Sequence, residues 1–248
     1  MNAGDAVSHY AQLAAATRSQ RGAGEPGWLE ERRASALASF TAGGFPTRKQ
    51  EGWRYTSLDT LLTHTFATPR EPVYRISGTS IGALRTTDAE ALRLVFCDGH
   101  LVETLSDINN LPDGILVSSL RDMLASPSRQ VAEQLDRLFA NDNGAFDYIN
   151  TTLAEDGLWL EVAAGVSMDR PIEVIYTSQQ RDTELLLAPR NLVIMHAGAQ
   201  ATLIEHFSSL PDSNDFTNSV TEIALGADAK LEHYRLQNEG MQTFHRAS

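Results

Sequence analysis

The amino-acid sequence predicts a mainly β protein in which an N-terminal helical region precedes a β-helix, a solenoid of stacked coils. Apolar residues recur at helical spacing in the first third of the chain, whereas short apolar runs with small turns between them fill the last third. A turn-and-strand phrase also recurs in the last third, at a period of roughly 28 to 33 residues that is typical of solenoids. A β-sandwich is the alternative, but that fold does not require the same phrase to recur.

Composition and charge limit the class of protein. The chain has 248 residues, of which 42% are apolar, so it can bury a full core and is expected to fold throughout. Its net charge of -12 opposes binding to nucleic acid, because phosphate contacts need clustered Lys and Arg. A single cysteine fits a reducing compartment, and the sequence contains neither a secretion signal nor an apolar run of about eighteen residues. We therefore expect a cytoplasmic protein with no nucleic-acid or membrane partner.

The first predicted region, residues 1–66, is helical. Apolar residues from Val7 to Leu13 have helical spacing and predict one helix. A second helix is expected to begin near Pro26 and to end at Gly43, because proline suits the first helical turn and glycine ends a helix. A capping-box pattern that starts at Thr56 predicts a third, short helix.

The second predicted region, residues 67–150, mixes helix and strand. The apolar run from Leu92 to Cys97 predicts a strand, and Asp98-Gly99 is a strong signal for a two-residue hairpin turn. The returning antiparallel strand is expected from Leu101 to Thr104. An amphipathic helix, marked by apolar residues from Val131 to Phe139, is expected near the end of this region.

The third predicted region, residues 151–248, consists of strands with small turns between them, interpreted as the first coils of the β-helix. Gly198 to Phe207 resembles Gly226 to Tyr234 apart from a one-residue slip, and Gly165 to Met168 opens a fainter copy. The expected strands are Leu158–Val162, Ile172–Tyr176, Leu192–Met195, Ala201–Phe207, Val220–Leu225 and Lys230–Leu236.

Two Glu-His pairs in the repeated phrase are the candidate metal ligands of the sequence. Imidazole and carboxylate groups both suit iron or zinc. Successive side chains of a strand point to opposite faces, so the two members of one pair cannot close on one ion. A site with one residue from each coil would need a bulge, and ordinary ladder residues are the competing interpretation. The candidates are Glu205, His206, Glu232 and His233.

The sequence offers little evidence for catalysis. Cys97 ends an apolar run, where a free cysteine usually behaves as a small buried hydrophobe. Gly22 to Gly27 matches the glycine pattern of dinucleotide sites, but a hydrophobic strand does not precede it and Pro26 lies inside it. The sequence also lacks a phosphate loop, a nucleophile elbow and a His-Glu-x-x-His motif. We therefore predict that the protein is not an enzyme and has neither catalytic nor cofactor-binding residues.

The segment GGFPTRKQEGWRYTSL, residues 43–58 and hereafter the connector, joins the second and third predicted helices. Trp53 and Tyr55 are two residues apart and would share a face in an extended segment, as anchors surrounded by charged side chains. The connector either packs on the domain as structure or presents a binding edge to a partner. The residues that define it are Pro46, Arg48, Lys49, Glu51, Trp53 and Tyr55.

Four separated phrases resemble the SufD family of iron–sulfur cluster assembly proteins, which are relatives of SufB. The hallmark is FPTRKQEGWRYT at residues 45–56, which is similar to the phrase that follows two N-terminal helices in the family. VFCDGH at 95–100 resembles a family hairpin, and PRNLVI at 189–194 and LEHYRLQ at 231–237 resemble two family coils. The four phrases occur in the family's order along nearly the whole chain.

The resemblance implies a right-handed parallel β-helix, a single-stranded solenoid, behind the N-terminal helical region. It also implies a non-catalytic scaffold subunit that joins a SufB-like relative and a SufC-like ATPase in building nascent iron–sulfur clusters. The cluster would then be handled by the complex, with no cofactor bound by this chain alone, and the isolated chain could form a homodimer. Family members continue through further coils into a C-terminal helical segment that carries the SufC contact and much of the SufB contact. Their functional histidine lies in that later part, and we expect this chain to be truncated before the helical segment.

Two other functions stay open on the residues alone. A β-helix carbohydrate-active enzyme would normally show a secretion signal and a cluster of acidic residues on one face of its coils. An independent metal-binding protein would use the four Glu and His candidates of the repeated phrase.

Overall fold

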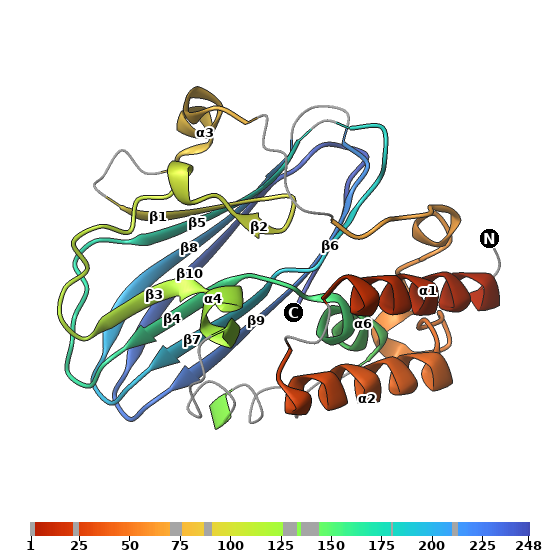
Figure 1. Ribbon diagram of the computed structural model, residues 1–248, viewed down its shortest axis with the longest axis horizontal. Coiled ribbons are helices and arrows are strands. Elements are labelled where there is room, and N and C mark those ends of the chain that lie inside the picture. The colour runs from red at the N-terminus through yellow and green to blue at the C-terminus, as the bar shows by residue number, and fades with distance from the viewer. Residues whose placement is uncertain are drawn as a thin grey trace.

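The computed structural model in Figure 1 shows a set of helices beside one end of two β-sheets. The residues that predicted an amphipathic helix between Val131 and Phe139 lie outside its described part. The described residues are 3–21, 25–69, 76–86, 91–125, 133–134, 144–179, 181–209 and 213–248.

Two long N-terminal helices are present as predicted, α1 (Ala3–Arg21) and α2 (Gly27–Gly43). The predicted limits of α2 are confirmed. The backbone nitrogen of Leu29 donates to the carbonyl oxygen of Pro26 at 2.9 Å, and Gly44 follows the last turn with a φ of 64° that favours glycine.

The third predicted helix is much shorter than the capping-box pattern suggested. In its place the structure has a single 3₁₀ turn, Leu61–Thr63, which follows another 3₁₀ turn in the connector, Glu51–Trp53. Two short α-helices cover the sheets elsewhere, α3 (Gly78–Leu84) near β1 and α4 (Leu120–Ala125) beside β3.

The helix α6 (Ala145–Leu153) was not anticipated, because the Asn and Gly residues before it suggested only a break in the chain. Eight of its nine residues are buried, and four of these are polar (Asp147, Asn150, Thr151 and Thr152), so the polar side chains of α6 face other parts of the protein and not solvent. Its Asn150 donates from Nδ2 to the carbonyl oxygens of Pro189 and Asn218, at 3.0 and 2.8 Å. These two bonds tie α6 directly to the strands beneath it.

The first sheet has five strands in the order β10-β8-β5-β1-β2. The hairpin predicted at Asp98-Gly99 is confirmed, with φ values of 49° and 79° in a two-residue turn. Its second strand is limited to two residues. The strands are β1 (Leu92–Cys97), β2 (His100–Leu101), β5 (Ile172–Ser178), β8 (Gln200–Ser209) and β10 (Lys230–Asn238).

The second sheet has the order β11-β9-β7-β4-β3, and β6 (Leu186–Leu187) pairs with β9. All six strands predicted for the last region are confirmed within the two sheets, whereas β3, β6 and β11 were not predicted. The strands on the main path are β3 (Ile115–Ser119), β4 (Leu158–Val162), β7 (Arg190–Met195), β9 (Phe216–Leu225) and β11 (Phe244–Ala247).

The predicted fold class, a right-handed parallel β-helix built as a single-stranded solenoid, is wrong. The described residues form a mixed α/β fold of two mixed sheets with five α-helices. The pairs β1–β2 and β3–β4 are antiparallel, while the other strand pairs are parallel. The repeated phrase corresponds to one of these parallel pairs, β8 with β10. The repeat therefore specified two neighbouring strands, but it did not specify the architecture of the whole chain.

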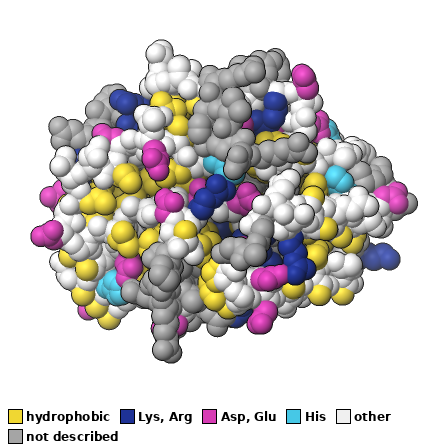
Figure 2. All heavy atoms as spheres, viewed as in Figure 1, with side chains coloured by type: hydrophobic (Ala, Val, Ile, Leu, Met, Phe, Trp, Pro, Cys, Tyr) yellow, Lys and Arg dark blue, Asp and Glu magenta, His cyan; other side chains and the backbone are white. Residues whose placement is uncertain are grey.

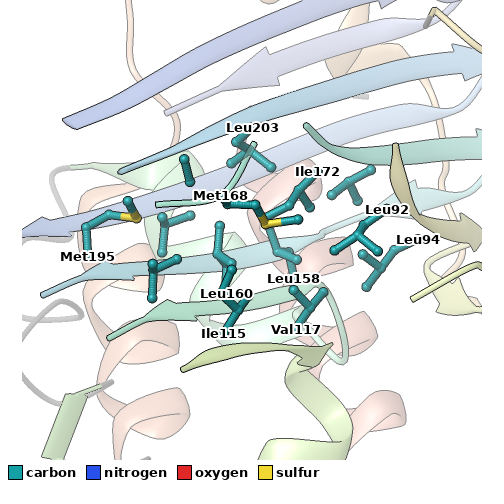
Figure 3. Packing of buried hydrophobic residues seen from close by; sticks show 14 of the residues in the cluster. Leu92, Leu94, Ile115, Val117, Leu158, Leu160, Met168, Ile172, Met195 and Leu203 are labelled. Carbon is teal, nitrogen blue, oxygen red and sulfur yellow. The ribbon is translucent and has the colours of Figure 1, made fainter. Parts of the chain in front are cut away.

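The main hydrophobic core lies between the two sheets, as Figure 3 shows. Alternate residues of each strand point into it, so that Leu92 and Leu94 of the first sheet meet Leu158 and Leu160 of the second. A second core packs α1, α2 and α6 together with β6 and β9, and aromatic rings dominate it. The first core includes Leu203 and Phe207, which flank Glu205 on β8, and the second includes Phe45 and Trp53 of the connector.

Candidate functional site

The side chain of Glu205, on β8, lies fully buried between the two sheets. Its Oε1 accepts hydrogen bonds from Asn191 Nδ2 at 2.6 Å and Thr221 Oγ1 at 2.8 Å, both on the second sheet. Its Oε2 lies 2.6 Å from His233 Nε2 and 3.1 Å from an Arg235 guanidinium nitrogen, both on β10. One carboxylate therefore connects strands of both sheets.

Strand alternation explains why this acidic residue points inward. Leu203, Glu205 and Phe207 lie on the same face of β8, and the two apolar members belong to the main core. In the β8–β10 ladder Glu205 pairs with Arg235, and His233 pairs with Leu203 on that same face. The diagonal between adjacent pairs brings the His233 ring to Glu205 in a regular ladder, without the bulge that we expected to be necessary.

The two Glu-His pairs of the sequence do not stack on each other. Glu205 pairs with Arg235, whereas Glu232 pairs with Thr202, so the identical dipeptides are offset by three residues in the ladder. An odd offset turns a side chain to the other face of the sheet. His206 and Glu232 consequently lie on the outer face, and the structure brings together only Glu205 and His233 of the four candidates.

The Glu205 carboxylate has no spare position for a further ligand. A carboxylate has about four lone-pair positions, and the four donors around Glu205 match that number. Burial alone would raise the pKa of Glu205, but the hydrogen bond from His233 and the charge of Arg235 outweigh it and hold the pKa below its ordinary value. In the part of the chain that is described, His, Cys, Asp and Glu do not form a group of three that could hold a metal ion.

Tyr176 extends the network through Asn191, and sequence reasoning missed both residues. The Tyr176 hydroxyl donates to Asn191 Oδ1 at 2.6 Å, and burial together with the nearby Glu205 charge raises the pKa of that hydroxyl well above its ordinary value. Asn191 thus links the tyrosine to the carboxylate. An asparagine inside an apolar strand is the one sequence signal that could have revealed this link, because a buried amide needs partners.

A second buried His–Glu pair, also missed, lies in the loop and strand that end the chain. His245 Nδ1 lies 2.6 Å from Glu239 Oε2, and both side chains are almost fully buried. Thr217 Oγ1 donates to the other oxygen of Glu239 at 2.7 Å. The His245 ring packs edge-on against Phe207, with centroids 4.8 Å apart. Neither residue lies in a recurring pattern, so their meeting depends on the fold alone.

Cys97 lies at the end of β1, fully buried, beside the hairpin turn. Burial, reinforced by the negative charge of Asp98, raises the pKa of its thiol to about 12. Because the thiolate is the reactive form of cysteine, the environment of Cys97 disfavours nucleophilic chemistry.

The connector forms a compact turn whose two aromatic residues do not share a face. Trp53 is partly buried against Phe146 of α6, with ring centroids 5.3 Å apart, whereas Tyr55 is 91% exposed. Phe45 supplies the buried ring of the connector, and its centroid lies 5.1 Å from that of Phe40 and 5.7 Å from that of Phe146. Phe45 and Trp53 therefore anchor the connector. Pro46 lies partly buried between them, and Arg48, Lys49 and Glu51 are exposed.

None of the described helices has the length and apolar character that crossing a bilayer requires.

Two family models match adjoining parts of the chain. The model described as the SufBD protein N-terminal region matches residues 5–174, and the model described as the SUF system FeS cluster assembly, SufBD core domain, matches residues 176–248. The chain therefore belongs to the SufBD family. This result confirms the resemblance that the four phrases carried. The predicted division into regions 1–66, 67–150 and 151–248 stays a prediction, as does the cytoplasmic location.

Curated relatives agree with the family match. The iron–sulfur cluster assembly protein SufD of Escherichia coli is 32% identical over 211 residues, which cover 84% of this chain and 46% of the relative. An iron–sulfur cluster assembly SufBD family protein of Synechocystis is 26% identical over 228 residues, which cover 89% of this chain and 50% of the relative. Protein ABCI7, chloroplastic, of Arabidopsis thaliana is 26% identical over 223 residues. The chain spans about half the length of these relatives.

Proposed function

We propose that this chain acts in iron–sulfur cluster assembly as a non-catalytic scaffold subunit, together with a SufB-like relative and a SufC-like ATPase. The observation that carries the proposal is the pair of SufBD family matches, which together extend over residues 5–174 and 176–248. The 32% identity to a curated SufD protein supports the same role. In this proposal the iron–sulfur cluster is the cargo of the complex, and contacts with other subunits are the chain's contribution.

The chemistry of the described residues is consistent with a scaffold. Sulfur transfer requires a reactive thiolate, and the buried Cys97 has a pKa of about 12, far above the pH of a cell. The Glu205 carboxylate already accepts hydrogen bonds from four donors on neighbouring strands, one of which is the ring of His233. Both features support partner contacts, in place of bond-making, as the role of this chain.

Co-purification with SufB-like and SufC-like subunits of the same source tests the proposal. The 248-residue chain is compared with a version extended to the length of the relatives. We expect a stable complex with at least the longer version, and a yield of iron–sulfur cluster that depends on that subunit. Failure of both versions to bind either subunit would refute the assembly role. Turnover of a substrate by the purified chain alone would refute its non-catalytic part.

The fold argues against one of the two alternative functions, and an experiment can test the other. A β-helix carbohydrate-active enzyme loses its structural basis, because the fold has two mixed sheets and not a solenoid. An independent metal-binding role is tested by anaerobic metal analysis of the purified chain. Stoichiometric iron or zinc that disappears in the Glu205→Gln variant would favour it over the scaffold.

A further inference from the structure

The connector is held rigidly although much of it is exposed. Its backbone closes three successive turns, from Gln50 N to Thr47 O at 2.9 Å, from Trp53 N to Gln50 O at 3.0 Å, and from Thr56 N to Trp53 O at 3.1 Å. The buried ring of Phe45 and the partly buried ring of Trp53 fasten it to the helical core. A surface that is already ordered loses little conformational entropy when a partner binds.

The connector exposes one tyrosine and three cations. Tyr55 is 91% exposed, and the guanidinium carbon of Arg54 lies 5.6 Å from the centre of its ring. Arg48 and Lys49 are exposed on the preceding turn. Among the salt bridges of the described residues, none involves these three cations. Tyrosine and arginine are the residue types that most often dominate binding energy in protein interfaces.

The charge of the connector is opposite to the charge of the whole chain. Three cations and one anion, Glu51, lie within residues 43–58, whereas the net charge of the chain is -12. Acidic side chains are spread over the face shown in Figure 2 and are not gathered in one patch. An acidic partner would therefore be repelled by much of the molecule and attracted at the connector, which fixes the orientation of binding.

A groove of about 430 Å³ lies beside this charged turn. Pro46, Gln50 and Trp53 form its connector side, and Phe146, Tyr148 and Arg246 form the opposite side. Arg246 is held by Asp147 at 2.8 Å and lies over the Phe146 ring. The lining of the groove combines apolar and polar side chains, which suits a segment that has an apolar side chain between carboxylates.

We propose that the connector is the docking surface for an acidic segment of a partner protein. Carboxylates of the segment contact Arg48, Lys49 and Arg54, and one of its apolar side chains packs on Tyr55 beside the groove. A membrane surface is a poorer match, because recognition of anionic lipid uses clusters of about four to eight Lys and Arg. The choice of a protein partner rests on the proposed function, since a scaffold subunit acts through subunit contacts.

Site-specific cross-linking tests this proposal in cells of the natural source. The photo-reactive analogue p-benzoylphenylalanine replaces Tyr55, and the cross-linked segment is identified by mass spectrometry. We expect a protein segment with an excess of Asp and Glu. The combined change Arg48→Glu, Lys49→Glu and Arg54→Glu should reduce the cross-link at least ~tenfold, as expected for loss of an energetic hot spot. The same analogue at Arg85, exposed at the end of α3, is the position control.

Lys230→Glu combined with Arg85→Glu is the charge control, which reverses two exposed cations outside the connector where the test variant reverses three within it. This control should leave the cross-link at position 55 unchanged. A cross-linking yield at position 55 no higher than at position 85 would overturn the proposal. A cross-linked lipid, or a cross-linked segment without an excess of Asp and Glu, would also overturn it. So would a cross-link that the triple reversal leaves unchanged. Thermal unfolding of each variant shows that it is folded, since exposed substitutions change stability little.

The outcomes separate this inference from the proposed function. A complex with the assembly subunits but no cross-link from position 55 would refute the docking surface and leave the assembly role standing. An acidic cross-linked partner outside the assembly system, without any complex with the assembly subunits, would refute the assembly role and leave the docking surface standing.

Discussion

Gly157, at the start of β4, is a position where a single added methyl group should disrupt the junction of two strands. A Cβ atom built there would lie 2.0 Å from the carbonyl oxygen of Arg190 and 2.8 Å from the side-chain oxygen of Asn191. Real contacts of a Cβ atom are essentially never closer than 3.0 Å, so β4 and β7 would have to separate by about 1 Å at this point. The backbone φ of 157° adds a conformational cost for any residue with a Cβ.

The expected cost follows from the bonds that this separation would break. Arg190 N donates to Asp156 O at 3.1 Å, and Leu158 N donates to Asn191 Oδ1 at 2.9 Å, on either side of Gly157. Loss of these two hydrogen bonds should lower the free energy of unfolding by roughly 2 kcal/mol, and residual strain should lower it by roughly 2 kcal/mol more. Gly157→Ala should therefore destabilise the protein by about 4 kcal/mol, which corresponds to a fall in Tm of about 10 °C for a chain of this size.

Two matched glycines separate the steric cost from the backbone cost. Gly165 has a φ of 71° with open space at its Cβ position, so Gly165→Ala should cost only about 1–2 kcal/mol. Gly43, in the last turn of α2, has open space and helical backbone, so Gly43→Ala should be neutral or slightly stabilising. The assay is urea and thermal unfolding followed by circular dichroism. A Gly157→Ala protein within about 1 kcal/mol of wild type, or no less stable than Gly165→Ala, would refute the reasoning.

Three further predictions concern the connector, Cys97 and Asp156. Trp53→Ala should destabilise the protein by about 2 kcal/mol, which is less than the ~3–5 kcal/mol expected for a fully buried tryptophan because Trp53 is only partly buried. Tyr55→Ala should leave the stability within about 0.5 kcal/mol of wild type, since Tyr55 is exposed. Equal losses of thermal stability in the two variants would contradict the assignment of Trp53 as an anchor. Cys97 should stay unmodified by iodoacetamide at pH 8 until the protein is unfolded, because its thiol has a pKa of about 12, and rapid labelling of the native protein would show an accessible thiolate. Burial raises the pKa of Asp156 from 3.8 to about 6, so the native state binds its proton more tightly and stability should fall by up to roughly 3 kcal/mol as the pH rises from about 4 to 6. Asp156→Asn should flatten that part of a urea-unfolding profile, and parallel profiles for the two proteins would exclude this carboxyl as the cause.

The sequence by itself determined features that depend on neighbouring residues. The ends of α2 follow from Pro26 and Gly44, since each residue acts through its own backbone torsion. The hairpin follows from Asp98-Gly99 for the same reason, and the apolar runs of the last region became strands. Family membership was also accessible, because phrases of six to twelve residues do not depend on the fold for their recognition.

The tertiary structure alone decided which faces meet. Strand alternation predicted that Glu205 and His206 point to opposite sides, but it does not say which side is the core. The register of β8 with β10 then brought His233, and not Glu232, to the buried carboxylate, and the facing sheet supplied Asn191 and Thr221. Local pattern contains no information on these long-range partners. The sequence therefore did not reveal the network around Glu205, nor that the ligand positions of its carboxylate are all filled.

The same limit explains the errors in architecture and at the connector. A repeated phrase favours parallel neighbours, and two mixed sheets satisfy that preference as well as stacked coils do. The spacing of Trp53 and Tyr55 predicted a shared face only for an extended chain, and the turns at Gln50 and Trp53 remove that condition. Residues fixed by their own torsions were predictable from the sequence. Those whose environment is made by distant segments were decided by the packing of the helices and sheets, because burial is a property of the whole fold.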